Sequence, residues 1–120
     1  MTLRDCYAAF GGNYDDVLGR LRSERMIQKF VLKFLDDASY ETLCVAMAAQ
    51  NREEAFRAAH TIKGVCQNLG FTALLASSSA LSDALRHEWM PEAPALAKQV
   101  GDDYRCVTEA ICAFQSALEA

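Results

Sequence analysis

One histidine of this sequence, His60, stands on the polar side of a long stretch with helical periodicity, residues 51–69. A helix turns by about 100° per residue, so the apolar residues of the stretch gather on the side opposite to His60. These apolar residues are Ala55, Ala58, Ile62, Val65, Cys66 and Leu69. The expected neighbours of the histidine are Phe56, Arg57, Lys63, Gly64 and Gln67. We therefore expect the imidazole of His60 to face solvent.

Two of these neighbours indicate what the imidazole does. Gly64 lies one turn after His60, in the middle of the helix, where a glycine costs about 1 kcal/mol relative to alanine. The missing side chain gives another molecule close access to the ring. Lys63 adds a cation that can pair with an anion on the ring and that favours the neutral, nucleophilic imidazole. The spacing suits an imidazole that accepts a phosphoryl group from a donor in line and passes it on, and the alternative is a surface or core histidine without a chemical role.

The same residues carry a resemblance to a known family. The sequence from Ala59 to Gly70, AHTIKGVCQNLG, resembles the signature A-H-x-(L/I)-K-G-x-x-x-N-L-G of histidine-containing phosphotransfer (HPt) domains. The resemblance covers about residues 23–118, and it is specific because it joins His, Lys and Gly at fixed helical offsets to a terminating Asn-Leu-Gly. Ile62 stands where leucine is commoner, but it lies on the core side of the helix.

The resemblance implies a four-helix bundle that carries phosphoryl groups between the aspartates of receiver domains in a multistep two-component phosphorelay. By that analogy His60 is the phospho-acceptor through Nε2, Lys63 steadies the phosphoryl group and Gly64 clears space for the receiver. Gln67 occupies a position that often hydrogen-bonds near the imidazole. In this family the Mg²⁺ needed for transfer belongs to the receiver. We therefore expect a phosphocarrier that is not an enzyme and has no cofactor or metal site of its own.

A receiver that reaches His60 must contact the exposed side of residues 51–69 and the adjoining part of residues 72–89. Phe56, Arg57 and Phe71 are therefore the candidate partner-binding residues. Packing between helices is the alternative role for both phenylalanines. The second histidine, His87, is interpreted as a surface residue that caps a helix end.

Two other functions stay open at this point. One is a helical adaptor or inhibitor that binds receivers without transferring phosphate, although intact His60, Lys63 and Gly64 argue against it. The other is a kinase-associated HPt module, phosphorylated by an ATP-binding domain. The sequence has no glycine-rich phosphate loop, so that domain would belong to another polypeptide or to a part of a longer protein outside this sequence. A helical metalloenzyme is excluded, because two histidines 27 residues apart and no Glu-x-x-His pair supply no ligand set.

The elements that must position His60 are all helical, and no stretch of the sequence indicates a strand. Asn13, Ser23 and Asn51 are expected N-caps, the last in a capping box with Glu54. Gly70 is expected to end the helix of His60, because glycine suits the position after a helix C-terminus.

The longest helices are predicted near residues 23–37, 51–69, 72–89 and 95–118. Because short connections make neighbouring helices antiparallel, we expect an all-α fold, an antiparallel up-down four-helix bundle. The bundle takes about residues 23–118, and short N-terminal capping helices take about residues 1–22. Pro91 and Pro94 are assigned to the loop before the last helix. The seam of that helix is Val100, Tyr104, Val107, Ile111, Phe114 and Leu118.

The composition sets the remaining bounds. A chain of 120 residues with 52% hydrophobic residues is enough for one domain with its own core. The formal charge of −4, with its cations scattered among acids, excludes nucleic acid as the main partner. No apolar run reaches the roughly 18–20 residues of a membrane span, and the first residues do not resemble a secretory signal. We expect a free-standing cytoplasmic monomer whose five cysteines are small, reduced core residues.

Overall fold

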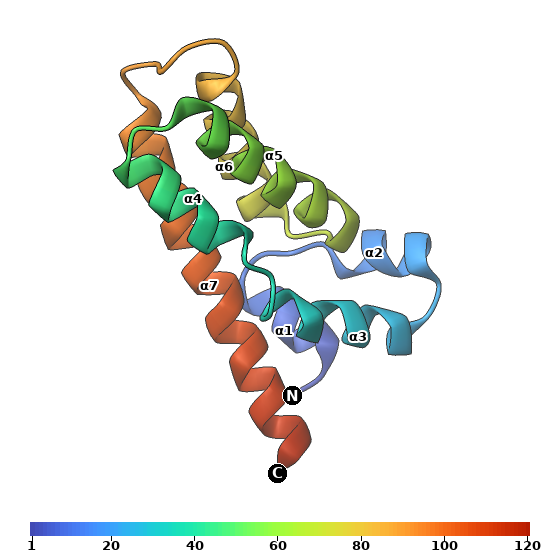
Figure 1. Cartoon of the computed structure of the whole chain (residues 1–120). Helices are drawn as coiled ribbons and strands as arrows, with labels where there is room; N and C mark the ends of the chain where they lie inside the picture. The colour runs from blue at the N-terminus through green and yellow to red at the C-terminus, as the bar shows by residue number, and fades with distance from the viewer.

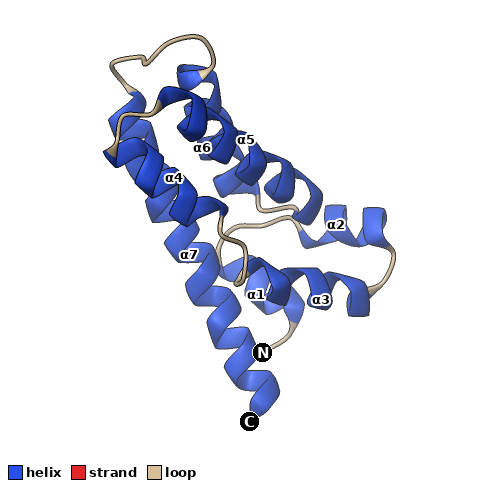
Figure 2. Ribbon diagram, viewed as in Figure 1, coloured by secondary structure: helices blue, strands red, loops and turns tan.

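The computed structural model describes all 120 residues and consists of seven helices with no strand (Figure 2). The first four helices are α1 (Leu3–Ala9), α2 (Tyr14–Leu21), α3 (Glu24–Phe34) and α4 (Ser39–Ala48). The last three are α5 (Arg52–Leu69), α6 (Thr72–Leu85) and α7 (Ala93–Glu119). The prediction of an all-α fold is confirmed. None of the seven helices combines the length and the apolar character needed to cross a membrane.

Helices α4 to α7 form the bundle, and α1 to α3 cover the end where both chain termini lie (Figure 1). α5 packs against α4 on one side and against α6 on the other, and α6 packs in turn against α7. Because the connections between α4 and α5 and between α5 and α6 are short, these neighbours run antiparallel. The predicted fold class, an antiparallel four-helix bundle with N-terminal capping helices, is therefore confirmed.

One helix of the bundle differs from the prediction. The sequence predicts a bundle helix over residues 23–37, but α3 divides its contacts among α2, α5 and α7, and it packs against α5 far less than α4 does. The shorter α4 takes its place. Only residues 49–51 separate α4 from α5, so the two helices must lie side by side, and helix length does not decide membership of the bundle.

The predicted N-caps of α2, α3 and α5 are confirmed. The side-chain oxygens of Asn13, Ser23 and Asn51 accept hydrogen bonds from the main-chain N–H groups of Asp16, Met26 and Glu54, at 3.0, 3.3 and 3.2 Å. The capping box predicted at Asn51 is only half formed, because the N–H of Asn51 donates instead to the carbonyl of Ala46 at 2.9 Å. A complete capping box joins Thr2 and Asp5 at the start of α1.

The boundaries of the last two helices also differ from the prediction. α6 ends at Leu85 and not near Glu88. α7 begins at Ala93, so Pro94 lies in its first turn and not in the preceding loop. Proline fits there, because the N–H groups of a first turn have no partner within the helix. The seam of α7 packs inward as far as Phe114, but Leu118 at the free end of the helix is 47% exposed.

A single hydrophobic core runs through the bundle and the cap. Cys6 and Cys66 lie fully buried in it, as predicted. The prediction is wrong for Cys44, Cys106 and Cys112, which are exposed. Cysteine is small enough to lie on either side of a helix, so its type alone does not fix its burial.

Candidate functional site

Helix α5 carries the predicted site, and its C-terminal end is fixed by Gly70. This residue has the left-handed backbone conformation, with φ of 71°, and its N–H donates to the carbonyl of Cys66. A side chain at Gly70 would also meet the main chain, because a Cβ there would lie 2.7 Å from the carbonyl oxygen of Asn13. Glycine is required on both grounds, and the predicted helix end is confirmed.

The helical phase predicted for α5 is confirmed by its burial. The buried residues of the helix are Ala55, Ala58, Ala59, Ile62, Cys66 and Leu69, and His60 is exposed. Val65, predicted on the apolar side, is half-buried. Burial raises the pKa of the Cys66 thiol to about 12, so this cysteine stays protonated and contributes packing rather than chemistry.

The imidazole of His60 makes no hydrogen bond to any other group of the protein. Side chains that come before and after it in the sequence do form hydrogen bonds. Its closest aromatic neighbour is Phe56, one turn earlier in α5. The two ring centroids are 5.8 Å apart, and the ring planes meet at 25°. The imidazole therefore lies at the surface with its nitrogens free of other protein groups.

Gly64 leaves the space next to His60 open, and Lys63 adds a cation that has no acidic partner. Gly64 is exposed, and a Cβ added to it would meet no heavy atom within 4 Å. The packing of this protein therefore does not explain the glycine. Lys63 is half-buried and makes no ion pair with an acidic side chain. A cation without an intramolecular partner is available to an anion bound beside the imidazole.

Gln67 shares the exposed side of α5 with His60, but no hydrogen bond joins the two residues. The hydrogen bond near the imidazole that the family resemblance implies is therefore absent from this structure. The main-chain carbonyl of Gln67 instead accepts from Nη2 of Arg20 at 2.9 Å. Arg20 belongs to α2, so this contact ties the last turn of α5 to the N-terminal cap.

The three candidate partner-binding residues lie in different environments. Arg57 is exposed and pairs with Glu53 at 2.8 Å and with Glu54 at 3.1 Å. Phe56 is half-buried beside His60. Phe71 is fully buried, so the prediction that it binds a partner is wrong, and the alternative of packing between helices holds.

The position of Phe71 has a physical cause. Its ring packs against those of Tyr7, Phe10 and Phe34, with centroid distances of 5.8, 5.1 and 5.1 Å. Tyr7 belongs to α1, Phe10 follows its last residue and Phe34 belongs to α3. The left-handed backbone of Gly70 turns the chain away from the helical path of α5, so the phase of that helix no longer applies to the next residue.

Two arginines near the site were not found from the sequence. The guanidinium carbon of Arg86 lies 5.3 Å from the centroid of the Phe56 ring. Nη1 of Arg52 donates to the carbonyls of Leu85 and Arg86, at 2.8 and 3.0 Å. Both contacts depend on the register between α5 and α6, which the spacing along either helix does not reveal.

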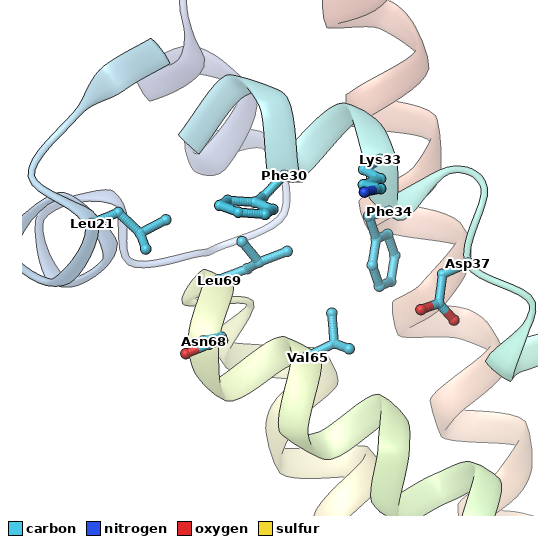
Figure 3. Close-up of a pocket in the computed structure, with 8 residues that line it drawn as sticks. All are labelled: Leu21, Phe30, Lys33, Phe34, Asp37, Val65, Asn68 and Leu69. Atoms are coloured by element: carbon cyan, nitrogen blue, oxygen red, sulfur yellow. The ribbon is translucent and has the colours of Figure 1, made fainter. Parts of the chain in front are cut away.

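A hollow of about 350 Å³ lies beyond the site, between α3 and the C-terminal half of α5 (Figure 3). Leu21, Phe30, Lys33, Phe34, Asp37, Val65, Asn68 and Leu69 line it. None of the predicted site residues is among them. The hollow is therefore separate from the surface that presents His60.

The fold and the site together define a helical bundle that presents one free imidazole beside a cation and an uncovered glycine. The family model for the Hpt domain, the histidine phosphotransfer domain, matches residues 25–120, and the chain belongs to this family. Hpt domains are phosphocarrier modules that take part in histidine phosphotransfer and interact with the receiver domains of two-component systems. Comparison with curated proteins and with solved structures gave no match.

Proposed function

We propose that this chain is a histidine phosphotransfer protein of a multistep phosphorelay. In this proposal His60 accepts a phosphoryl group from the aspartyl phosphate of one receiver domain and passes it to the aspartate of another. The observation that carries the proposal is the exposed imidazole of His60 beside the open space at Gly64, in a chain of the Hpt domain family.

The transfer step needs little covalent help from the protein. The lone pair of Nε2 attacks phosphorus, the N–P bond forms, and the P–O bond to the aspartate breaks, so that the carboxylate leaves with the bonding electrons. The same step in reverse delivers the group to the second receiver. Catalysis of such a step is mainly positioning and charge stabilisation. We assign the charge stabilisation to the ammonium group of Lys63, which no carboxylate of this chain engages.

The partner approaches over the exposed side of α5. Gly64 leaves room for it, Gln67 extends the same surface by one turn, and Arg57 offers a contact at its edge. Arg57 already pairs with two glutamates, so we expect it to contribute orientation more than affinity. The Mg²⁺ that the transfer needs is held by the receiver, and this chain acts as a monomer.

The experiment that tests this function is phosphotransfer from a receiver domain that has first been phosphorylated by acetyl phosphate. We expect the wild-type protein to become a phosphoprotein that is labile in acid and stable in base, and the His60→Gln protein to remain unlabelled. The matched control is His87→Gln, because His87 is also exposed but lies after the end of α6. This control should be labelled like the wild type.

Two results would contradict the proposal. Labelling of the His60→Gln protein at the wild-type rate would show that His60 is not the acceptor. Binding of the receiver by both proteins without labelling of either would instead indicate an adaptor that binds receivers and transfers nothing.

A further inference from the structure

The ring of Phe56 is stacked on the imidazole of His60. Side chains on a helix lean toward its N-terminus, so His60 leans over the residues of the preceding turn. There its imidazole stacks on Phe56, with a centroid distance of 5.8 Å and an interplanar angle of 25°. This geometry lies in the range of offset-stacked aromatic pairs. No hydrogen bond within the protein holds either nitrogen of the imidazole, so no other directional contact sets its rotamer.

Phe56 is itself held by the neighbouring helix. The guanidinium carbon of Arg86 lies 5.3 Å from the centroid of the Phe56 ring, within the range of a cation–π contact. Nη2 of Arg86 also pairs with Asp83 at 3.3 Å, which limits the freedom of the guanidinium group. The main chain at Arg86 is fixed as well, because its carbonyl accepts from Nη1 of Arg52 at 3.0 Å. The contacts therefore run from the end of α6 through Phe56 to the imidazole.

The two flanks of the imidazole along α5 differ. Toward the N-terminus of the helix the ring meets Phe56. Toward the C-terminus it meets Gly64, which has no side chain and leaves open space. The open flank gives a phosphoryl donor access to the ring, and in-line transfer requires a ring nitrogen to point along the approach of the donor. The contact with Phe56 on one flank can fix the direction of a ring nitrogen of His60, and the open space at Gly64 on the other flank admits the donor.

We propose that Phe56 is a positioning residue for His60. Its ring, braced by Arg86, keeps the imidazole in the orientation that presents a ring nitrogen to the donor. This inference rests on the proposed function, which supplies the phosphorylated receiver as the natural donor. It deepens that function, because it assigns to Phe56 a role in the reactivity of His60 rather than only in contact with the partner. Loss of the stack lets the imidazole rotate among its rotamers, and we expect transfer to slow by roughly two- to tenfold.

The test uses potassium phosphoramidate, a small donor that needs no docking surface. The lone pair of Nε2 attacks phosphorus, the N–P bond to histidine forms, and the P–N bond of the donor breaks. The donor reacts in its zwitterionic form, whose nitrogen already has three protons, so neutral ammonia leaves with the electrons of that bond, and the proton on Nδ1 passes to the buffer. We would measure the rate at which His60 is phosphorylated in the wild type and in Phe56→Leu, Phe56→Tyr and Phe30→Leu.

The variants separate positioning from general damage to the fold. Phe56→Leu removes the ring and keeps an apolar side chain, whereas Phe56→Tyr keeps the ring and should retain the wild-type rate. Phe30→Leu is the matched control, because Phe30 is also half-buried but lies on α3, away from the site. NMR spectra of the imidazole C–H groups add a direct geometric readout. The ring current of Phe56 should shift these signals in the wild type and in Phe56→Tyr, and this shift should be lost in Phe56→Leu.

The proposal is supported if Phe56→Leu slows the phosphoramidate reaction and moves the His60 signals while Phe56→Tyr and Phe30→Leu do neither. It is overturned if Phe56→Leu reacts with phosphoramidate at the wild-type rate, even where transfer from a receiver is slower, because Phe56 would then be only a docking contact. Failure of the proposed function looks different. The wild-type protein would then react with phosphoramidate but accept nothing from a phosphorylated receiver, and the phosphoramidate rates would still decide the role of Phe56.

Discussion

The hydroxyl group of Tyr7 donates a hydrogen bond of 2.6 Å to the main-chain carbonyl of Leu69, the last residue of α5. Next to it, the N–H of Asn13 donates to the carbonyl of Gly70 at 2.9 Å. Arg20 donates to two further carbonyls in the last turn of α5. A helix C-terminus leaves several carbonyls without partners. The N-terminal cap of this protein supplies the missing donors and thereby holds the helix that presents the histidine.

Replacement of Tyr7 by phenylalanine tests this contact. Tyr7→Phe keeps the ring in the core and removes the donor, which leaves the carbonyl of Leu69 without a partner in a buried position. We expect the free energy of unfolding, measured by urea denaturation, to fall by about 1–3 kcal/mol. Tyr104→Phe is the control, because Tyr104 is half-buried and its ring stacks on Tyr40. An equal loss in both variants would show that the hydrogen bond to Leu69 is not the cause.

Replacement of Gly64 by alanine should have opposite effects on stability and on transfer. A Cβ at Gly64 meets no atom within 4 Å, and alanine is the better helix former, so we expect the free energy of unfolding to rise by about 0.5–1 kcal/mol. The same Cβ leans toward His60 and narrows the open flank of the imidazole. Single-turnover transfer from a phosphorylated receiver should therefore slow, and Gly64→Leu should slow it further.

Gly19 offers the matched control for this substitution. It is also a helical glycine, in α2, and a Cβ there would also meet no atom within 4 Å. Gly19→Ala should therefore give a similar gain in stability with no change in the rate of transfer. If Gly64→Ala were more stable and transferred at the wild-type rate, the clearance argument would be wrong.

Much of the structure around α5 could be predicted because it depends on interactions within one or two turns. The N-cap at Asn51 and the helix end at Gly70 are both set by the residue itself and its nearest main-chain groups. The exposure of His60 follows from the 3.6-residue period of the helix and from the apolar residues on its opposite side. Such local features are visible in the sequence before any tertiary contact is known.

The features that could not be predicted depend on contacts between helices. The sequence left Phe71 between partner binding and packing between helices, and only the contacts from α1 and α3 that enclose it decide for packing. The contact of Arg86 with Phe56 exists only because α6 returns alongside α5 in one particular register. The place of α4 in the bundle likewise follows from a short connection and not from its length. Periodicity along one helix carries no information about any of these.

The buried thiols should make the protein less stable at alkaline pH. Burial raises the pKa of Cys6 to about 11 and that of Cys66 to about 12, from an ordinary value of 9.0. The unfolded chain therefore releases these protons near pH 9, while the folded chain keeps them. The stabilisation is complete below about pH 9 and is lost as the pH rises toward 12, by up to about 1.4 kcal/mol per pH unit for each thiol.

Urea denaturation between pH 7 and pH 10.5 measures this slope. Cys66→Ala should lower the stability at pH 7 because it leaves a small cavity, but its free energy of unfolding should then fall less steeply above pH 9. Cys112→Ala, at an exposed cysteine, should keep the wild-type slope. Equal slopes in all three proteins would show that the Cys66 thiol does not couple folding to pH.

The charge of Lys63 should matter for transfer more than for folding. Its ammonium group makes no ion pair in the folded protein, so Lys63→Gln breaks no ion pair and should leave the unfolding curve close to that of the wild type. Transfer should slow by roughly tenfold, both from a receiver and from phosphoramidate, because the cation no longer stabilises the phosphoryl oxygens. The effect should be smaller than the 10²–10³-fold loss typical of a buried oxyanion donor, since water also reaches this surface.

Lys29→Gln on α3 removes the same charge away from the site and should transfer like the wild type. Equal rates in Lys63→Gln and Lys29→Gln would show that Lys63 acts only through the net charge of the protein.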